Sequence, residues 1–425
     1  MSTGRKLLDD CFLHDKDRLR HEECLGLILE RLGPVTGKST VPIDTASGMY
    51  LAQDVAAPRD VPLHTNSAVD GYAFAHSSLA ATGGTLEVAA RIAAGELTPA
   101  PLAAGTAARI FTGATLPSGA DTVVMQEDCE ASSDGRSVDI PAGAKPGSNI
   151  RKAGEDLRAG DAVLNTGQRL RPQDIATLAS IGFAEVEMFE PVRVALVSSG
   201  NELVQPGEPI SEGQVYDSNR TMIASLLSSL PVQVTDLGVL ADDASIVETK
   251  LEQACEAHDL ILTSGGASRG EEDHIVEVLD KLGKRHLWQI AIKPGRPMVM
   301  GQIGDCAVMG LPGNPVAAFV CFLLYCRPAI ARLGGGIWLE PQRFPVQAGF
   351  SVPKKKPDRR EFWRGWLEHD QDGRLVAQKF TRDGSGLISG LRQATGLIEV
   401  TEDVTEIRQG QELAFIPFSQ FGIHN

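Results

Sequence analysis

Residues 259–274 read Asp-Leu-Ile-Leu-Thr-Ser-Gly-Gly-Ala-Ser-Arg-Gly-Glu-Glu-Asp-His, and this stretch decides the fold. Its apolar residues 260–262 stop at a serine and paired glycines, and amphipathic spacing begins again at Ile275. A buried strand, a tight loop and a helix in this order are typical of open α/β sheets, which bind ligands at the carboxyl ends of their strands. The stretch therefore predicts an α/β domain with a ligand site at this loop.

The loop combines features of an anion site and of a cation site. Gly265 and Gly266 would let backbone N–H groups approach an anion closely. Glu271, Glu272 and Asp273 follow as oxygen donors that suit a divalent cation. Phosphate together with magnesium is one interpretation. The alternative is an ordinary strand-to-helix turn whose acids decorate the first helical turn.

Strands and helices alternate on both sides of this stretch. The pattern predicts strands at 192–197, 232–239, 260–263, 289–292, 298–300 and 307–309, and helices at 221–230, 244–257 and 316–326. Strand–helix–strand repetition indicates a parallel, doubly wound sheet.

The flanking segments follow other patterns. Residues 20–55 look helical and then extended, residues 56–150 consist of short apolar runs between Gly/Pro turns, and helical spacing returns at 170–185. After about residue 340 the chain is β-like again, and the lysines at 354–356 fit a solvated turn. We expect a β-rich insert before the α/β domain and a small β domain after it.

Composition indicates the broad class. The 425 residues carry a formal net charge of −15, which argues against nucleic acid or an anionic membrane as the main partner. Seven scattered cysteines without a Cys-x-x-Cys pair fit reduced thiols. No secretory signal is evident, and the longest apolar run, residues 316–326, is too short to cross a bilayer. We expect a soluble cytoplasmic protein of about two to four domains.

Charged side chains follow several of the predicted strands. Glu202 comes just after a strand and would face the ligand edge of the sheet near Asp273, with a solvated loop acid as the alternative. Asp242 and Asp243 follow the next strand in the equivalent position, where one would cap a helix and the other would face the site. Lys293 and Arg296 lie on a proline-framed loop that suits a phosphate or another oxyanion.

Further candidates lie at turns. Gly313 and Asn314 precede the apolar helix and could form an anion cradle at its first turn. In the insert, Asp70 stands before a glycine and Thr112 offers a hydroxyl at a tight turn, but turn chemistry alone accounts for both. Asp156 ends a loop of small, basic and acidic residues of the kind that contacts substrates.

Taken together, these motifs resemble the molybdopterin molybdenumtransferase family, which includes the C-terminal domain of gephyrin. The resemblance runs from about residue 20 onward and rests on residues 66–72, 111–114, 123–127, 154–156, 199–203, 216–220, 264–273, 293–297 and 310–315, in that order. It implies an elongated homodimer of four-domain chains. The implied domains are a helical linker domain (1–55 and 156–189), a β-rich inserted domain (56–155), a three-layer α/β core (190–338) and a C-terminal β barrel-like domain (339–425).

The resemblance also implies a reaction. Members of the family insert molybdate into adenylylated molybdopterin, with magnesium-dependent release of AMP, to form molybdenum cofactor. Mg²⁺ is the implied cofactor. The implied partners are the two substrates, a second copy of the chain and, transiently, the molybdopterin adenylyltransferase and downstream cofactor-handling proteins. A weakly active pterin-binding paralogue and a gephyrin-like scaffold are the alternatives.

Family roles carry over to matching positions of this sequence. The resemblance implies that Glu202, Asp242 and Asp273 bind the metal and take part in catalysis. The other implied catalytic residues are Lys293, Asp70 and Thr112. The implied substrate-binding residues are Asp156, Ser264, Gly265, Gly266, Arg296, Gly313, Asn314, Arg364 and Ser385. Those of the insert are expected to close the cleft of the partner subunit.

Four positions depart from the family pattern. Gln289 and Arg296 each replace a lysine, Thr65 replaces an acid and His274 replaces an aromatic residue. Because an amide offers an oxyanion only a dipole where a lysine offers a full charge, we expect Gln289 to raise the requirement for molybdate.

Overall fold

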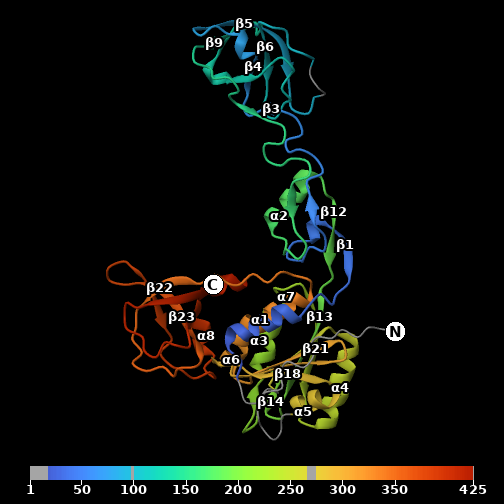
Figure 1. The fold of residues 1–425 in the computed structure, drawn as a ribbon, viewed down its shortest axis with the longest axis vertical. Coiled ribbons are helices and arrows are strands. Elements are labelled where there is room, and N and C mark those ends of the chain that lie inside the picture. The colour runs from blue at the N-terminus through green and yellow to red at the C-terminus, as the bar shows by residue number, and fades with distance from the viewer. Residues whose placement is uncertain (1–17, 97–99, 266–273, 425) are drawn as a thin grey trace. The chain divides into compact units, whose positions relative to one another are not determined.

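The computed structural model describes residues 18–96, 100–265 and 274–424, apart from the side chains of residues 287 and 288 (Figure 1). The chain forms two compact units. The larger contains residues 1–52, 166–171 and 186–425, and the smaller contains residues 53–165 and 172–185. The division into four domains stays a prediction.

The larger unit is built on a six-stranded sheet of order β16-β13-β17-β21-β20-β18. Its strands are β13 (Val192–Ser199), β16 (Val232–Leu240), β17 (Leu260–Ser264), β18 (Lys284–Gln289), β20 (Pro297–Ile303) and β21 (Cys306–Leu311). The first four strands in the sheet order are parallel. β20 pairs antiparallel with β21, and β18 pairs antiparallel with β20, so the expectation of a wholly parallel sheet is wrong at this edge. The two-residue turn between β20 and β21 is too short for the crossover that parallel neighbours need.

Helices cover both faces of this sheet, which confirms the predicted three-layer core. They are α1 (His21–Arg31), α3 (Ser218–Leu227), α4 (Ala244–Ala257), α5 (His274–Leu282), α6 (Pro315–Cys321) and α7 (Arg327–Leu333). Val194 and Leu196 of β13 pack with α1, α3, α6 and α7, whereas Ala195 and Val197 pack with α4 and α5. Alternate residues of a strand point to opposite faces, so β13 holds both layers together. Figure 1 shows α4 and α5 on the side away from α1 and α7.

The apolar run expected at 316–326 continues as a longer helix. Pro315–Leu333 is helical throughout, with a π-helical turn at Phe322–Cys326 between α6 and α7. By length and composition it is the one helix in the described ranges that could span a membrane, but 94% of its most apolar window is buried inside the protein. Its apolarity therefore belongs to the core.

Two local differences from the sequence expectations have clear causes. The helix expected from residue 221 begins at Ser218, because Asp217 caps it by accepting the N–H of Arg220 at 3.1 Å. The strand expected at 289–292 is divided between β18 and the short β19 (Ile292–Lys293), which leaves the core sheet and pairs with the C-terminal domain.

The C-terminal segment forms a closed five-stranded barrel, as expected of a small β domain. Its strands are β22 (Phe344–Ala348), β23 (Arg360–His369), β24 (Leu375–Lys379), β25 (Gly396–Val400) and β26 (Glu412–Pro417). β23 pairs with both β24 and β25, which closes the ring, and β19 adds to β23 outside it. The helix α8 (Ser389–Gln393) lies between β24 and β25 in the chain.

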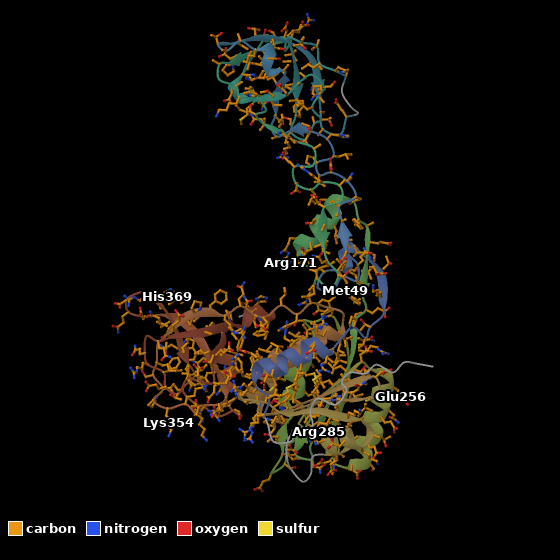
Figure 2. All side chains as sticks on the ribbon, viewed as in Figure 1. Met49, Arg171, Glu256, Arg285, Lys354 and His369 are labelled. Atoms are coloured by element: carbon orange, nitrogen blue, oxygen red, sulfur yellow. The ribbon has the colours of Figure 1, made fainter. Side chains whose placement is uncertain are left out.

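The lysine run at 354–356 is not a wholly solvated turn. Lys355 is 4% exposed, and its ammonium donates to the carbonyl oxygens of Lys356, Arg359 and Thr401 at 3.3, 2.8 and 2.8 Å. Three carbonyl acceptors satisfy the three donors of a lysine, which makes the burial tolerable. Lys354 instead lies at the periphery of the barrel (Figure 2).

The smaller unit contains the predicted β-rich insert as a sheet of order β7-β4-β6-β5-β9-β8. Its strands are β4 (Gly71–Phe74), β5 (Gly83–Ile92), β6 (Thr106–Ile110), β7 (Thr122–Met125), β8 (Glu130–Ala131) and β9 (Ser137–Pro141). Gly71 lies in β4 rather than in a turn, and a Cβ there would overlap the carbonyl oxygen of Val124. The glycine after Asp70 thus serves close strand packing, not turn chemistry.

Three further pairs of short strands form two-stranded sheets within the described residues. β1 (Lys38–Pro42) pairs with β12 (Glu185–Phe189), β2 (Val55–Ala56) with β11 (Ala162–Leu164), and β3 (Asn66–Ser67) with β10 (Ile150–Arg151). The helix expected near 170–185 is α2 (Pro172–Ile181).

The N-terminal helix is anchored by a buried histidine. His21 is 2% exposed, and its Nδ1 lies 2.8 Å from the hydroxyl oxygen of Tyr325. Burial, with smaller contributions from Arg360 and Arg343, lowers the pKa of His21 to about 3. The folded chain therefore leaves this ring neutral at pH values where the unfolded chain protonates it.

We expect His21 to make stability depend on pH. Between pH 7 and pH 5 the unfolded chain takes up a proton that the folded chain refuses, so the free energy of unfolding should fall by ~2 kcal/mol through this group. His21→Phe removes the titrating group, so between pH 7 and pH 5 its free energy of unfolding should fall by ~2 kcal/mol less than that of the wild type. Urea unfolding at both pH values measures it, and equal losses in the two proteins would contradict the assignment.

Candidate functional site

A cavity of about 340 Å³ lies at the carboxyl ends of the parallel strands β13, β17 and β21, where the sequence predicted a ligand site. We call it the core cavity. Of the predicted residues that the structure describes, four line it, namely Glu202, Ser264, Gly265 and Gly313. The structure therefore brings together residues from three separate strand ends.

Two glycines shape the strand ends at this cavity. Gly200 has φ +148°, and a Cβ on it would collide with the carboxylate of Glu202. Gly265 has φ +83°, and its N–H donates to the carbonyl oxygen of Leu311 at 3.1 Å. Only glycine adopts both conformations without strain, so these positions set how closely Glu202 and the β17 loop approach.

One buried acceptor in the core cavity has no partner within the described ranges. Asn219, near the start of α3, donates its side-chain N–H to the carbonyl oxygen of Gly313 at 2.8 Å, while its Oδ1 makes no hydrogen bond there. A buried oxygen left unpaired costs free energy unless a ligand satisfies it. Asn219 is thus suited to accept an N–H from a bound molecule, a role that the sequence analysis did not assign to it.

An ion-pair network fixes the wall of the core cavity. Arg220, 4% exposed, pairs with Asp217 at 2.9 Å and with Asp236 at 2.5 Å, and it also donates to Gln205. These contacts tie α3 and β16 to the loop between the short parallel strands β14 (Leu203–Val204) and β15 (Val215–Tyr216). The wall is therefore held by charge-assisted bonds, of which the Arg220–Asp217 pair is buried while the Asp236 side chain is 48% exposed.

The predicted metal ligands are placed only in part. Asp242 does not line the core cavity, but its N–H donates to Oδ1 of Asn201 at 3.1 Å, beside Glu202. Its carboxylate lies 3.9 Å from Nε2 of His274, and a hydrogen bond to Glu277, followed by Asp242, raises the pKa of His274. The neighbouring Asp243 caps α4 through the N–H groups of residues 245 and 246.

Asp273 and Gly266 lie outside the described residues. Within the described ranges, no three His, Cys, Asp or Glu side chains gather in a way that could hold a metal ion. Glu202 and Asp242 do supply carboxylate oxygens on adjoining loops, and such oxygens are what Mg²⁺ prefers. The residues present thus fit the implied ion in kind, and the complete ligand set stays a prediction.

A second cavity, of about 310 Å³, lies between the α/β core and the barrel of the same unit. We call it the basic cavity. Among the described residues, one acid, Asp383, lines it, together with seven cationic side chains: Arg18, Lys293, Arg296, Arg359, Arg364, Lys379 and Arg382. In a chain of net charge −15, this concentration of cations marks a local site for an anion.

The predicted loop of Lys293 and Arg296 enters the basic cavity. Gly295 between them has φ +104°, and a Cβ there would overlap the sulfur of Cys321 in α6, so the loop lies tightly on that helix. Nε and Nη2 of Arg296 donate to Oε1 of Gln289 at 3.3 and 3.2 Å. The two departures from the family pattern are therefore in contact.

Arg364 lines the basic cavity, but its guanidinium donates to backbone carbonyl oxygens of the protein. It is 6% exposed and donates to the carbonyl oxygens of Leu387, Arg382 and Gly384 at 2.7, 2.8 and 3.2 Å. Burial lowers the pKa of Arg364. Its main effect is to fold the loop that carries Ser385 into the cavity.

The two cavities adjoin. Residues 312, 314 and 385 line the basic cavity, and residues 313, 315, 386 and 388 line the core cavity. The loops that separate them are joined where the N–H of Val316 donates to the carbonyl oxygen of Ser385 at 3.0 Å. One ligand could therefore reach both, or two ligands could meet at this boundary.

The insert residues form their own group in the smaller unit. Asp70 accepts the N–H and the hydroxyl of Thr112 at 2.8 and 2.7 Å, and these bonds, the N–H first, lower the pKa of Asp70. Asp156 is exposed in the same unit. The structure thus brings the first two together, as a carboxylate that accepts two hydrogen bonds from a threonine.

Sequence reasoning missed most of the basic cavity. Arg359 directly precedes β23, whereas Lys379 ends β24 and Arg382 follows three residues later, so nothing in the spacing along the chain groups them. One signal was present: a buried strand, β23, reads Arg-Glu-Phe-Trp-Arg, and charged residues inside a buried strand are typical of functional sites.

Comparison with known proteins agrees with this architecture. Residues 19–182 match the MoeA N-terminal region (domain I and II), residues 195–332 match the family described as "Probable molybdopterin binding domain", and residues 346–418 match the MoeA C-terminal region (domain IV). The molybdopterin molybdenumtransferase of Haemophilus influenzae is 37% identical over 393 residues, which cover 92% of this chain and 96% of that protein.

Two further relatives extend the comparison. Molybdopterin molybdenumtransferase 2 of Mycobacterium tuberculosis is 34% identical over 406 residues, covering 92% of this chain and 97% of that protein. The crystal structure of the molybdopterin biosynthesis moeA protein from Pyrococcus horikoshii OT3 superposes with a TM-score of 0.80 at 28% identity, covering 94% of this chain and 100% of that one.

The matched regions, in this order on an α/β core followed by a closed barrel, define a MoeA-type protein of molybdenum cofactor biosynthesis. The chain belongs to the molybdopterin molybdenumtransferase family, which confirms the resemblance found in its sequence.

Proposed function

We propose that the protein inserts molybdate into adenylylated molybdopterin and releases AMP in a magnesium-dependent reaction. The observation that carries the proposal is the pair of adjoining cavities, one with an acid, a glycine loop and an unpaired acceptor, the other rich in cations. A pterin with N–H donors fits the first. Molybdate is a dianion and fits the second.

Each group has a role that its chemistry supports. Asn219 would accept a pterin N–H, and the backbone at Gly265 would approach the phosphates. Lys293 and Arg296 would hold the oxyanion near the boundary of the two cavities. Glu202 and Asp242, with Asp273, would hold Mg²⁺, which when bound neutralises phosphate charge and favours departure of AMP.

The test is AMP release from adenylylated molybdopterin by the purified full chain. We expect turnover only when Mg²⁺ and molybdate are both present, with molybdenum cofactor as the second product. AMP release without molybdate, or binding of the substrate with no turnover under any condition, would overturn the proposal and favour a binding or scaffold role.

We also infer a cytoplasmic homodimer whose sites take Asp70, Thr112 and Asp156 from the partner subunit. The hydrogen-bonded Asp70 and Thr112 support this inference, because they present a fixed carboxylate and a hydroxyl on a unit that contributes none of its described residues to the lining of either cavity.

Restoring the family lysine should ease the molybdate requirement. Gln289→Lys adds a charge beside Arg296, so the molybdate concentration for half-maximal turnover should fall roughly tenfold if one charge-assisted contact is regained. Gln289→Met is the matched control, because it removes the acceptor of Arg296 without adding charge. Molybdate titrations of the three proteins measure the effect, and an unchanged or higher value in Gln289→Lys would place position 289 away from the oxyanion.

A further inference from the structure

Glu361 is a buried acid beside the basic cavity. Its side chain is 3% exposed and is not among the residues that line the cavity. It nevertheless contacts three that do. Nε and Nη2 of Arg359 lie 2.9 and 2.8 Å from its Oε1, while Nε1 of Trp363 and Nζ of Lys293 lie 2.8 and 3.7 Å from its Oε2.

We propose that Glu361 is the positioning residue of the oxyanion site, holding Lys293, Arg359 and the indole of Trp363 in the arrangement that receives the anion. The inference deepens the proposed function and rests on it for the nature of the anion. The chemical class of ligand is a tetrahedral dianion such as molybdate.

The backbone delivers Glu361 to this position. β19 and β23 pair in parallel, with Lys293 opposite Glu361 in the register. Lys293 belongs to the core loop and Glu361 to the barrel, so one carboxylate joins the two walls of the cavity. Because parallel pairing fixes the register, the lysine cannot slide along the strand away from its partner.

The loop of Arg359 is fixed at a second point. Lys355 donates to the carbonyl oxygen of Arg359 at 2.8 Å, while Glu361 accepts from its guanidinium. Backbone and side chain are thus held by separate partners. An arginine so restrained has lost its rotamer freedom before the ligand arrives, and preorganised donors bind more tightly than free ones.

Charge and position make opposite predictions for this residue. If Glu361 only neutralised its neighbours, its removal would leave the cavity more positive and strengthen anion binding. If it positions them, its removal would free Lys293 and Arg359 to move apart into water, because the two cations repel each other once their shared carboxylate is gone. Anion binding would then weaken. A single substitution therefore separates the two accounts.

The same barrel offers a matched control in Glu399. Its side chain is also 3% exposed, and it pairs with Arg343 at 2.5 Å and with Arg360 at 3.0 Å. Neither arginine lines the basic cavity. Glu399→Gln thus disturbs a buried acid with two cationic partners on the strand next to β23, without touching the anion site.

The experiment measures the Kd of molybdate by calorimetry at fixed ionic strength, using the full chain, and the molybdate KM and kcat for AMP release. Glu361→Gln should raise Kd and KM about tenfold and leave kcat within about threefold. Glu399→Gln should change the Kd of molybdate less than about twofold, although it should lower the melting temperature about as much as Glu361→Gln does. Glu361→Asp keeps the charge and shortens the reach, so it should also raise Kd.

The outcomes separate this inference from the function it rests on. A wild-type chain that binds no molybdate would overturn both. Wild-type binding with an unchanged or lower Kd in Glu361→Gln and Glu361→Asp would overturn only the positioning role. Should Glu361→Gln fail to fold, Glu361→Asp decides: a raised Kd supports the role, and a wild-type Kd refutes it.

Discussion

Replacing Asp273 by asparagine should lower turnover at least about a hundredfold, or ~2.7 kcal/mol in the barrier, while the fold survives. Asparagine keeps the size of the side chain and removes the charge that would bind Mg²⁺. Asp273 lies outside the described residues, but the next residue, His274, begins α5 and lies 3.9 Å from Asp242. The expected loss therefore follows from the carboxylates that the sequence and fold direct to this sheet edge.

Asp243→Asn provides the matched control for this measurement. Asp243 is a neighbouring acid, but its oxygen caps α4, and asparagine caps a helix about as well as aspartate. Turnover in this control should stay within about twofold of the wild type. AMP release is followed against Mg²⁺ concentration in all three proteins. If Asp273→Asn turned over at the wild-type rate with its Mg²⁺ dependence unchanged, the residue would have no part in the metal centre.

The core of the fold could be predicted because local patterns matched it. The helix expected at 244–257 has those bounds in the structure, and β13, β16 and β17 lie where short apolar runs placed them. The antiparallel edge could not be predicted in the same way. Whether β20 and β21 pair antiparallel depends on the turn that joins them, and the hydrophobic pattern of a buried strand does not record direction.

The sequence predicted more of the core cavity than of the basic cavity. The core cavity was accessible because parallel strands end at one edge, so Glu202, Ser264 and Gly265 could be grouped from their positions after strands. The basic cavity depends on how the barrel folds back against the core. Lys355 shows the limit most clearly, because only the closure of three backbone carbonyls around it distinguishes it from the exposed Lys354.

Mixed dimers should recover activity that neither parent variant shows. Asp70 lies in the smaller unit and Asp273 in the larger, and we expect each working site to combine an Asp70 from one chain with an Asp273 from the other. Asp70→Asn and Asp273→Asn homodimers should then both be nearly inactive. A dimer with one chain of each kind would contain one site with both changes and one with neither.

The amount of recovery distinguishes shared sites from sites built within one chain. After complete exchange at equal concentrations, half of the dimers are mixed and each has one intact site, so activity should rise to about a quarter of the wild-type value. Exchange is verified by co-purification of differently tagged chains, and a mixture of two Asp273→Asn preparations is the control for handling. If exchange is complete and activity stays at the level of the parents, Asp70 and Asp273 serve the same chain's site, because changes confined to one chain's site leave no intact site in a mixed dimer.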